Sequence, residues 1–270
     1  MDLSKVKMVV TDMDGTLLNS KHEVSSRFFQ LFEKLKENNI LFVAASGRQY
    51  HSIIDKLHSI KDDILVIAEN GAIAKIKEKE LLNTSLSKDT ISKLLQTVAK
   101  IDNVYTVLCG KNKAYIKSDT GNFAGKFKEY YASYELLDNL ENYDDEILKI
   151  AIYHFESSER FIYPKVKHLE ENLKVKVSGE NWLDLSHQNA HKGYALKKLQ
   201  ELYQISPAET MVFGDYNNDL EMLAEADYSF AMANAHSNVT DIANYQTASN
   251  DEFGVELILE QLIKSKESKI

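Results

Sequence analysis

The amino-acid sequence predicts an α/β protein with a doubly wound, Rossmann-like core around a parallel sheet, and with an α+β domain inserted into that core. Near both ends of the chain, short apolar runs between polar turns alternate with amphipathic helical patterns, as in buried parallel strands joined by helices. The middle of the chain instead shows pairs of short strands around polar turns, which indicate antiparallel hairpins. We expect residues 1–82 and 188–270 to form the core, and residues 83–187 to form the insert.

The first part of the core is predicted to run strand, helix, strand, helix, strand. An apolar run ends at Asp12, and Ser25 or Ser26 can cap the next helix, whose apolar side chains recur on one face. Further apolar runs predict strands and a hairpin at 40–45, 64–68, 72–76 and 81–82.

The insert is predicted to alternate hairpins with helices. Ser87 can cap a helix over residues 88–101, and a helix rich in Phe and Tyr is expected near residues 122–131. Pro164 suits the first turn of a later helix that contains Leu169 and Leu173. The strands of the insert are expected at 104–108, 114–116, 147–155, 175–177 and 182–185.

The last part of the chain returns to alternating helices and strands. A helix from Lys192 to Tyr203 is expected to bury apolar side chains that include Leu202. The lysine-rich tail after Ile263 is expected to fray. The other predicted strands lie at 210–213, 228–232 and 245–248, and the other helices lie near 220–223, 238–243 and 255–263.

Composition limits the class of protein and its partners. The chain has 270 residues, 44% hydrophobic and 27% charged, which is typical of a soluble globular protein with an ample core. Its net charge of −9 argues against nucleic acid or an anionic membrane as a partner. The sequence shows no signal peptide and no run of membrane-spanning length, so a cytoplasmic protein is expected. The single cysteine, Cys109, excludes an internal disulfide and suits a buried apolar position.

Two aspartates at the end of the first strand form the first candidate site. Asp12 and Asp14 are one residue apart, so an extended backbone would point both carboxylates to one side. Two charges that close repel each other unless a cation or a shared proton compensates them. Ligands of open α/β sheets bind beyond the carboxyl ends of the strands, which favours a metal-assisted reaction centre here. A polar turn that merely ends the strand is the alternative.

Three further polar clusters are expected at the same edge of the sheet. Asp12 and Asp215, with a backbone carbonyl and water, would suit the oxygen coordination of Mg²⁺. Ser46 can donate a hydrogen bond to an anionic oxygen, and Lys192 supplies a compact positive charge. Phosphoryl transfer needs such a set of groups, since it depends mostly on positioning and charge neutralisation. The three clusters are Ser46-Gly47, Lys192-Gly193 and the segment from Asp215 to Asp219.

Each cluster also has a purely structural interpretation when it is taken alone. Ser46 fits an ordinary turn between a strand and a helix, and Lys192 fits a surface lysine at a helix start. The segment from Asp215 to Asp219 fits a capped turn, and it lacks the ligand spacing of an EF-hand. His187 and His191 have the i, i+4 spacing of zinc ligands, but no third ligand is evident.

The order of the clusters along the chain resembles that of the four motifs of the haloacid-dehalogenase superfamily of phosphatases. The position of the insert, and Asn70-Gly71 after the third strand, resemble the Cof-type subfamily with its large α+β cap of the C2B type. The resemblance spans nearly the whole chain and implies a Mg²⁺-dependent phosphatase that forms an aspartyl-phosphate. The matching segments are Asp12-Met13-Asp14-Gly15-Thr16-Leu17, Ser46-Gly47-Arg48, Lys192-Gly193 and Gly214-Asp215-Tyr216-Asn217-Asn218-Asp219.

The resemblance implies a role for each site residue. Asp12 would be the nucleophile and a metal ligand, and Asp14 would be the general acid and base, with its backbone carbonyl on the metal. Asp215 would complete the metal site, and Asp219 would orient Lys192 or metal-bound water. The groups expected to hold the phosphoryl group are the backbone N–H of Met13 together with Ser46, Gly47, Lys192 and Asn218.

The expected partner is a small phosphorylated metabolite, such as a sugar phosphate, a nucleotide or a phosphorylated cofactor, and the expected assembly is a monomer or a weak dimer. Two alternatives remain. A phosphomutase would return the phosphoryl group from the aspartyl-phosphate to a sugar. A non-enzymatic phospho-accepting or ligand-sensing protein would keep it, although Asp14 argues against this because it would speed hydrolysis.

Two segments depart from the family pattern. Relatives often have proline and glycine in the loop before the lysine, where this chain has neither in residues 186–191. Residues 231–235 contain alanine where glycine is common. Neither departure touches the four motifs, so both concern the loops on the substrate side.

Overall fold

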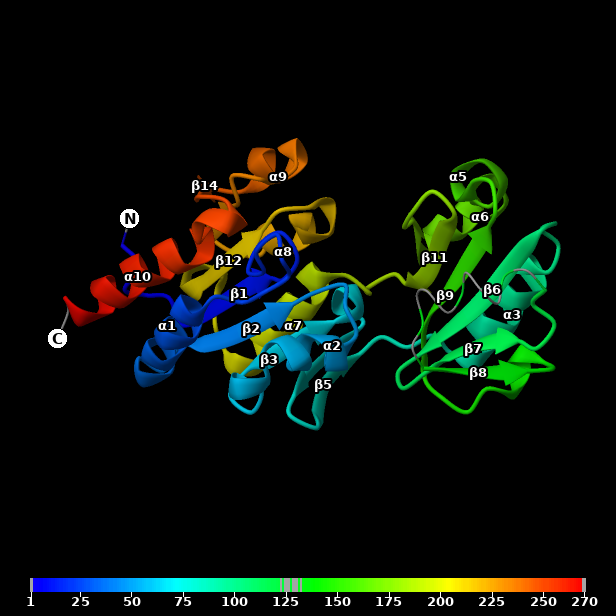
Figure 1. Ribbon diagram of the computed structural model, residues 1–270, viewed down its shortest axis with the longest axis horizontal. Helices are drawn as coiled ribbons and strands as arrows, with labels where there is room; N and C mark the ends of the chain where they lie inside the picture. Colours follow the sequence, from blue (N-terminus) through cyan, green and yellow to red (C-terminus); the bar gives the residue numbers. More distant parts are fainter. Residues whose placement is uncertain (1, 122, 124–126, 128–130, 132, 269–270) are drawn as a thin grey trace. The chain divides into compact units, whose positions relative to one another are not determined.

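A computed structural model describes residues 2–268 except 122, 124–126, 128–130 and 132, and it divides into two compact units (Figure 1). The core unit comprises Met1–Asn83 and Ala190–Ile270, and the inserted unit comprises Thr84–Asn189. The chain therefore leaves the core unit and returns to it once.

The core unit is built on an eight-stranded sheet with the order β14-β13-β12-β1-β2-β3-β4-β5. All neighbours from β14 to β3 pair in parallel, and β4 and β5 add an antiparallel hairpin at one edge. Because β1 lies between β2 and β12, the carboxyl ends of these three strands meet at one edge of the sheet. The strands are β1 (Met8–Asp12), β2 (Leu41–Ala45), β3 (Leu65–Ala68), β4 (Ile73–Ile76), β5 (Lys79–Asn83), β12 (Thr210–Gly214), β13 (Tyr228–Ala231) and β14 (Tyr245–Gln246).

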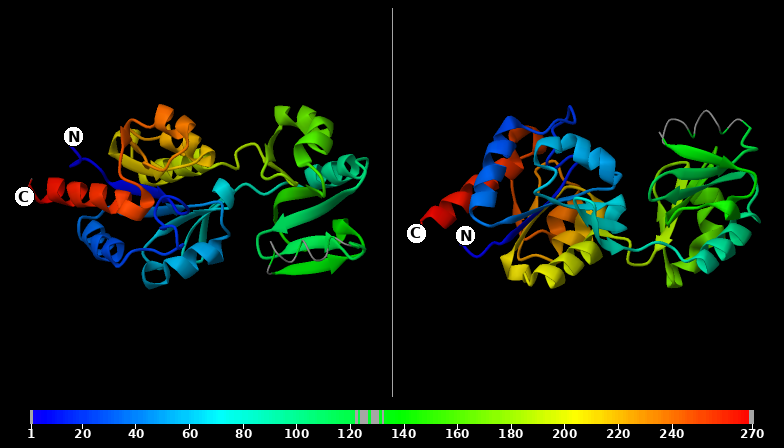
Figure 2. Two further views of the ribbon diagram at one scale, coloured as in Figure 1. Left: turned by 45° about the horizontal axis from the view of Figure 1, so that its top comes forward. Right: turned by 90° about the horizontal axis from the view of Figure 1, so that it is seen from below.

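Helices cover both faces of this sheet (Figure 2). Alternate strand residues serve two separate hydrophobic cores, with Val9 in one core and Met8 and Val10 in the other. The first core includes side chains of α1 (Ser26–Glu37), α2 (Tyr50–Lys56) and α10 (Gly254–Glu267), and the second includes those of α7 (Lys192–Tyr203), α8 (Leu220–Leu223) and α9 (Ser237–Ile242). The predicted doubly wound core is thus confirmed.

Short-range sequence signals set the N-terminal ends of α1 and α7. Ser25 caps α1, because its Oγ accepts a hydrogen bond from the backbone N–H of Phe28 at 3.0 Å. His191 caps α7 in the same way, with Nδ1 accepting from the N–H of Tyr194 at 3.2 Å. Single 3₁₀ turns complete the core unit at η1 (His58–Ile60), η2 (Glu69–Gly71), η5 (Pro207–Glu209), η6 (Asn217–Asp219) and η7 (Asn250–Glu252).

The inserted unit is built on a six-stranded sheet with the order β10-β11-β9-β6-β7-β8. Its strands pair antiparallel except for β7 and β8. One face packs on α3 (Lys88–Val98), α5 (Ser158–Phe161) and α6 (Tyr163–Val166), and the other carries an aromatic cluster in which Phe123 and Phe127 are buried. The strands are β6 (Val104–Gly110), β7 (Ala114–Lys117), β8 (Tyr134–Leu137), β9 (Ile147–His154), β10 (Leu173–Val177) and β11 (Trp182–His187), and the 3₁₀ turns are η3 (Leu140–Asn142) and η4 (Lys167–Glu171).

Three predictions for the inserted unit need correction or comment. The helix expected to contain Leu169 and Leu173 is wrong, because the chain forms short helical turns up to Glu171 and Leu173 begins β10. The alternation of apolar and lysine residues in β10 already carries the strand signal there. β8 was not predicted, since its half-exposed residues show no clear alternation. The aromatic helix expected near residues 122–131 lies largely outside the described residues.

Two predictions for the core unit are also wrong. Leu202 of α7 is 55% exposed, because it lies on the face of α7 that turns away from the sheet. The tail after Ile263 stays helical to Glu267, and Lys266 Nζ there donates to the backbone oxygen of Ser4 at 2.7 Å. The single cysteine is buried, as predicted. No helix in the described part of the chain is both long and apolar enough to cross a membrane.

Candidate active site

The core unit brings the polar ends of several segments to one edge of its sheet. Asp12 ends β1, Ser46 follows β2, Asp215 follows β12, and Lys192 opens α7. Strand adjacency explains the first three, because β1 pairs in parallel with both β2 and β12. The structure therefore places residues that are far apart in the sequence within reach of one another.

Lys192 is the centre of a buried ion cluster. Its side chain is fully buried, and Nζ lies 2.5 Å from Asp12 Oδ1 and 2.7 Å from Asp219 Oδ1. Burial alone would lower the pKa of Lys192, but the charges of Asp12 and Asp219 raise it well above its ordinary range. Lys192 is thus a permanent positive charge inside the protein, and its interpretation as a surface lysine is wrong.

Asp12 is an acidic group in an unfavourable environment. It is 5% exposed, and burial raises the pKa of its carboxyl to about 8 in spite of the contact with Lys192. The nearby charges of Asp219 and Asp215 add to the rise. Three carboxylates face one ammonium, so two negative charges stay uncompensated when all four groups are ionised. A divalent cation carries the charge that this cluster lacks.

Oxygen atoms of Asp12, Asp215 and Asp219 lie within 4.8 Å of one another, which is close enough for one metal ion. Both carboxylate oxygens of Asp219 already accept hydrogen bonds from the protein, however. Its Oδ1 accepts from Lys192, and its Oδ2 accepts from the backbone N–H groups of Asp215 at 3.0 Å and Tyr216 at 3.2 Å. The donor set therefore fits a hard cation held by Asp12 and Asp215, with Asp219 orienting the lysine and the loop.

Asp215 approaches the cluster only because a glycine stands opposite. Its Oδ1 accepts from Thr16 Oγ1 at 3.1 Å, and burial raises the pKa of its carboxyl to about 6. Gly15 has a φ of +80°, and a Cβ at this position would lie 2.3 Å from Asp215 Oδ2. Glycine both tolerates the left-handed backbone and leaves the space that the carboxylate occupies.

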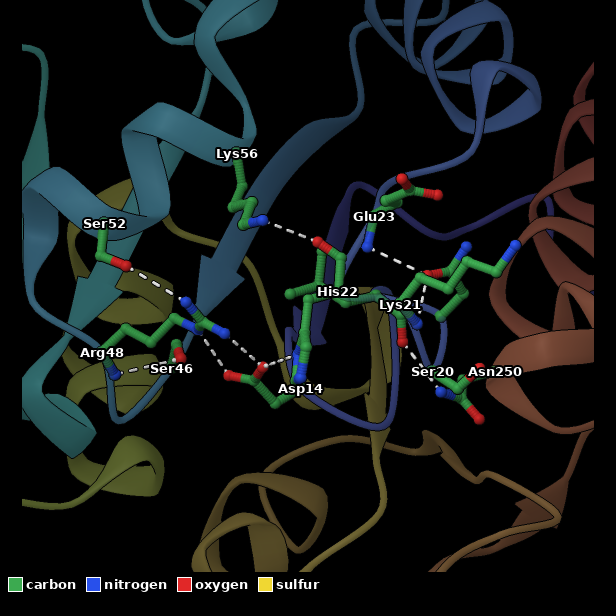
Figure 3. Close-up of polar contacts among 12 residues, drawn as sticks. Asp14, Ser20, Lys21, His22, Glu23, Ser46, Arg48, Ser52, Lys56 and Asn250 are labelled. Carbon is green, nitrogen blue, oxygen red and sulfur yellow. Dashed lines mark hydrogen bonds and ion pairs between the residues drawn. The ribbon is translucent and has the colours of Figure 1, made fainter.

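Asp14 lies beside this cluster and forms a two-point ion pair with Arg48 (Figure 3). Arg48 Nε donates to Asp14 Oδ2 and Nη2 donates to Asp14 Oδ1, both at 2.6 Å. The hydrogen bonds from Arg48 hold the pKa of the Asp14 carboxyl below its usual range. Arg48 is itself held by Ser52 Oγ at 3.2 Å, and His22 Nδ1 lies 3.3 Å from Asp14 Oδ1. The side chain of Asp14 is 42% exposed, so solvent reaches it.

The predicted phosphoryl-holding residues occupy the same edge. Ser46 is buried, and its Oγ accepts from the N–H of Arg48 at 3.1 Å. The side chain of Met13 is buried in the hydrophobic core, so only its backbone can serve a site. Asn218 Nδ2 donates to Asn70 Oδ1 at 3.0 Å, and Gly47 lies against the same Asn70 side chain.

Sequence reasoning did not assign a role to Arg48, Asn70 or Thr16. Each is a polar residue that follows a core strand at the carboxyl edge of the sheet. That position alone could have marked it as a candidate site residue. The zinc interpretation of His187 and His191 gains no support, because His191 Nδ1 caps α7 and His187 Nδ1 accepts from the N–H of Asn189 at 3.1 Å.

A doubly wound core that holds a buried lysine among aspartates at its carboxyl edge defines a hydrolase of the haloacid-dehalogenase class. Residues 9–259 match the family described as haloacid dehalogenase-like hydrolase, so the chain belongs to this family. The predicted membership in the superfamily is confirmed.

Similar proteins agree with this assignment. The chain is 34% identical to the 5-amino-6-(5-phospho-D-ribitylamino)uracil phosphatase YbjI of Escherichia coli K12, over 96% of this chain and 97% of that protein. The crystal structure of SMU.1108c from Streptococcus mutans has a TM-score of 0.82 and 30% identity, over 96% and 99% of the two chains. The HAD subclass IIB sugar phosphatase BT4131 shares the fold, with a TM-score of 0.74 and 21% identity over 95% and 98%. The predicted enzyme class, a phosphatase, is confirmed.

Proposed function

We propose that the protein is a Mg²⁺-dependent phosphatase that hydrolyses small phosphate monoesters through an aspartyl-phosphate on Asp12. The observation that supports this most is the buried cluster around Lys192. It holds the Asp12 carboxylate beside a permanent positive charge and lacks two further positive charges. Such a cluster suits an anionic substrate that arrives together with a divalent cation.

In this proposal Asp12, Asp215 and the backbone carbonyl of Asp14 hold the Mg²⁺ ion. When bound, the ion supplies positive charge to the phosphoryl oxygens and favours the ionised form of the carboxylates around it. Lys192 fixes one oxygen of Asp12, which leaves the other oxygen to attack. Ser46, Asn218 and the backbone N–H groups of Met13 and Gly47 donate hydrogen bonds to the phosphoryl group.

The reaction has two displacement steps. A bond forms between an Asp12 oxygen and phosphorus while the bond from phosphorus to the leaving oxygen breaks, and Asp14 gives its proton to that oxygen. Water then attacks the phosphorus of the aspartyl-phosphate. Asp14 takes a proton from this water, and Asp12 leaves as a free carboxylate. Inorganic phosphate and an alcohol are the products.

The pair between Arg48 and Asp14 favours one of these steps over the other. Arg48 keeps Asp14 ionised, which suits the base that activates water. The acid step needs a protonated Asp14, which the two hydrogen bonds from Arg48 oppose. We infer that substrate binding loosens this pair before the leaving oxygen takes its proton.

For the substrate, we propose a phosphorylated sugar or sugar alcohol, or a metabolite that carries one. The name of the YbjI relative describes a phosphorylated ribityl compound, and that of BT4131 describes a sugar phosphatase. We propose further that residues 83–187 act as the cap domain that the family resemblance implies, and that they select the leaving group.

Phosphate release from a panel of sugar phosphates, nucleotides, pyridoxal phosphate and flavin mononucleotide, with Mg²⁺ or with EDTA, tests the proposal. We expect release of phosphate only with a divalent cation, and none from Asp12→Asn. Near-wild-type release of phosphate by that variant would rule out Asp12 as the nucleophile. Turnover that requires a sugar bisphosphate and releases no phosphate would instead identify a phosphomutase, and an aspartyl-phosphate that persists would identify a phospho-accepting protein.

A further inference from the structure

The turn after β3 has an unusual backbone conformation. Three consecutive residues have positive φ, with 52° at Glu69, 56° at Asn70 and 99° at Gly71. Residues with a Cβ adopt this left-handed region at a cost, and they keep it where the surrounding structure requires it, often at functional sites. Two of these three residues are not glycine. A simple reversal of the chain would not need non-glycine residues in this conformation.

The backbone of this turn holds the loop after β2. The N–H of Asn70 donates to the backbone oxygen of Ser46, and the N–H of Glu69 donates to that of Arg48, both at 3.0 Å. The Asn70 side chain lies on the same loop, since a Cβ at Gly47 would be 3.0 Å from Asn70 Oδ1. The loop that contains two predicted phosphoryl-holding residues is thus fixed from one side by Asn70.

The same side chain also reaches the loop after β12. Asn70 Oδ1 accepts the hydrogen bond from Asn218 Nδ2 at 3.0 Å, across 148 residues of sequence. On the other side of the turn, Gly71 packs on the start of α7, where a Cβ at Gly71 would lie 2.8 Å from the backbone nitrogen of Lys192. The turn therefore contacts three of the four segments that bear the predicted site.

We propose that Asn70 is a positioning residue of this active site. Its backbone N–H sets the place of the Ser46–Gly47 loop, and its side-chain oxygen sets the orientation of the Asn218 amide. Asparagine suits both tasks, because it tolerates the left-handed backbone and carries an amide acceptor. The inference rests on the proposed function, in which these groups hold the phosphoryl group of the substrate.

Asn70→Gly separates the two tasks. Glycine adopts a φ near +56° without strain, so this variant keeps the turn and loses only the amide. We expect kcat/KM to fall about 5- to 20-fold, in line with one misplaced hydrogen-bond donor, and inorganic phosphate to inhibit correspondingly less. Asn39→Gly is the matched control, since Asn39 has the same φ of 56° but lies exposed at the end of α1. Asn39→Gly should change neither kcat/KM nor the inhibition by inorganic phosphate.

A double-mutant cycle shows whether Asn70 acts through Asn218. In the Asn218→Ala background, Asn70→Gly should lower kcat/KM less than about twofold further, because the contact is already lost. Losses that multiply would overturn the proposal, since they would mean that the two residues act independently. Thermal unfolding of each variant shows whether any loss of activity reflects a damaged fold.

The outcomes separate this inference from the proposed function. If the wild type neither releases phosphate from any monoester nor binds inorganic phosphate, the proposed function fails. If the wild type does both and Asn70→Gly behaves like Asn39→Gly, the inference about Asn70 alone fails.

Discussion

Asp12→Asn is expected to inactivate the enzyme and, without divalent cations, to stabilise its fold. Asp12, Asp215 and Asp219 place three carboxylates around the single ammonium of Lys192. Asparagine keeps the shape of Asp12 and removes one negative charge from this buried cluster. Lys192 keeps Asp219 as an ionic partner at 2.7 Å, so the variant leaves no unpaired buried charge.

The size and the sign of the effect follow from the pKa of Asp12, which burial raises from 3.8 to about 8 in the folded protein. A folded pKa above the unfolded pKa means that stability from this group is full below pH 3.8 and is lost as the pH rises towards 8. At about 1.4 kcal/mol per pKa unit, the upper bound is about 6 kcal/mol. Neighbouring charged groups contribute to this rise, so we expect the variant to gain about 1–3 kcal/mol over the wild type between pH 5 and pH 8.

Urea unfolding in EDTA at pH 5, 6, 7 and 8 measures this gain. Asp241→Asn, at an exposed position on α9, is the matched control and should show no such trend. Saturating Mg²⁺ should make the wild type the more stable of the two, because in the proposed metal site the variant lacks the Asp12 carboxylate as a ligand. If Asp12→Asn is less stable than the wild type in EDTA at pH 8, or if the difference does not change with pH, the electrostatic reasoning is refuted.

Three other substitutions test separate parts of the site. Asp14→Asn should lower kcat by about 10²–10⁴-fold through loss of acid–base catalysis, and steady-state kinetics with an unchanged Mg²⁺ requirement would show it. Gly15→Ala should raise the Mg²⁺ concentration for half-maximal activity by about tenfold or more, since its methyl group would displace Asp215. An unchanged Mg²⁺ titration would contradict the proposal that Asp215 is a metal ligand. Lys192→Met should cost about 3–5 kcal/mol in urea unfolding with EDTA, because it strands buried carboxylates, and a loss below about 1 kcal/mol would argue against a buried ion cluster.

Local patterns in the sequence were enough for most of the core unit. The apolar run before Asp12 became the central strand, Ser25 became the cap of α1, and the helix expected from Lys192 to Tyr203 has those bounds. These features depend on neighbours within a few residues, which a sequence displays directly. The errors occurred where longer-range packing decides. Leu173 joined a strand because β11 pairs with it, and Leu202 stayed exposed because no element covers its side of α7 in the described residues.

By itself, the sequence determined the alternation of strands and helices and the order of the four polar motifs that mark the family. Only the tertiary structure decided how those motifs interact. It brought Lys192 onto Asp12 across 180 residues and Asn218 onto Asn70 across 148, and it paired Arg48 with Asp14. The physical reason is that parallel pairing places the carboxyl ends of distant strands side by side, so the contacts of the site depend on sheet order and not on spacing along the chain.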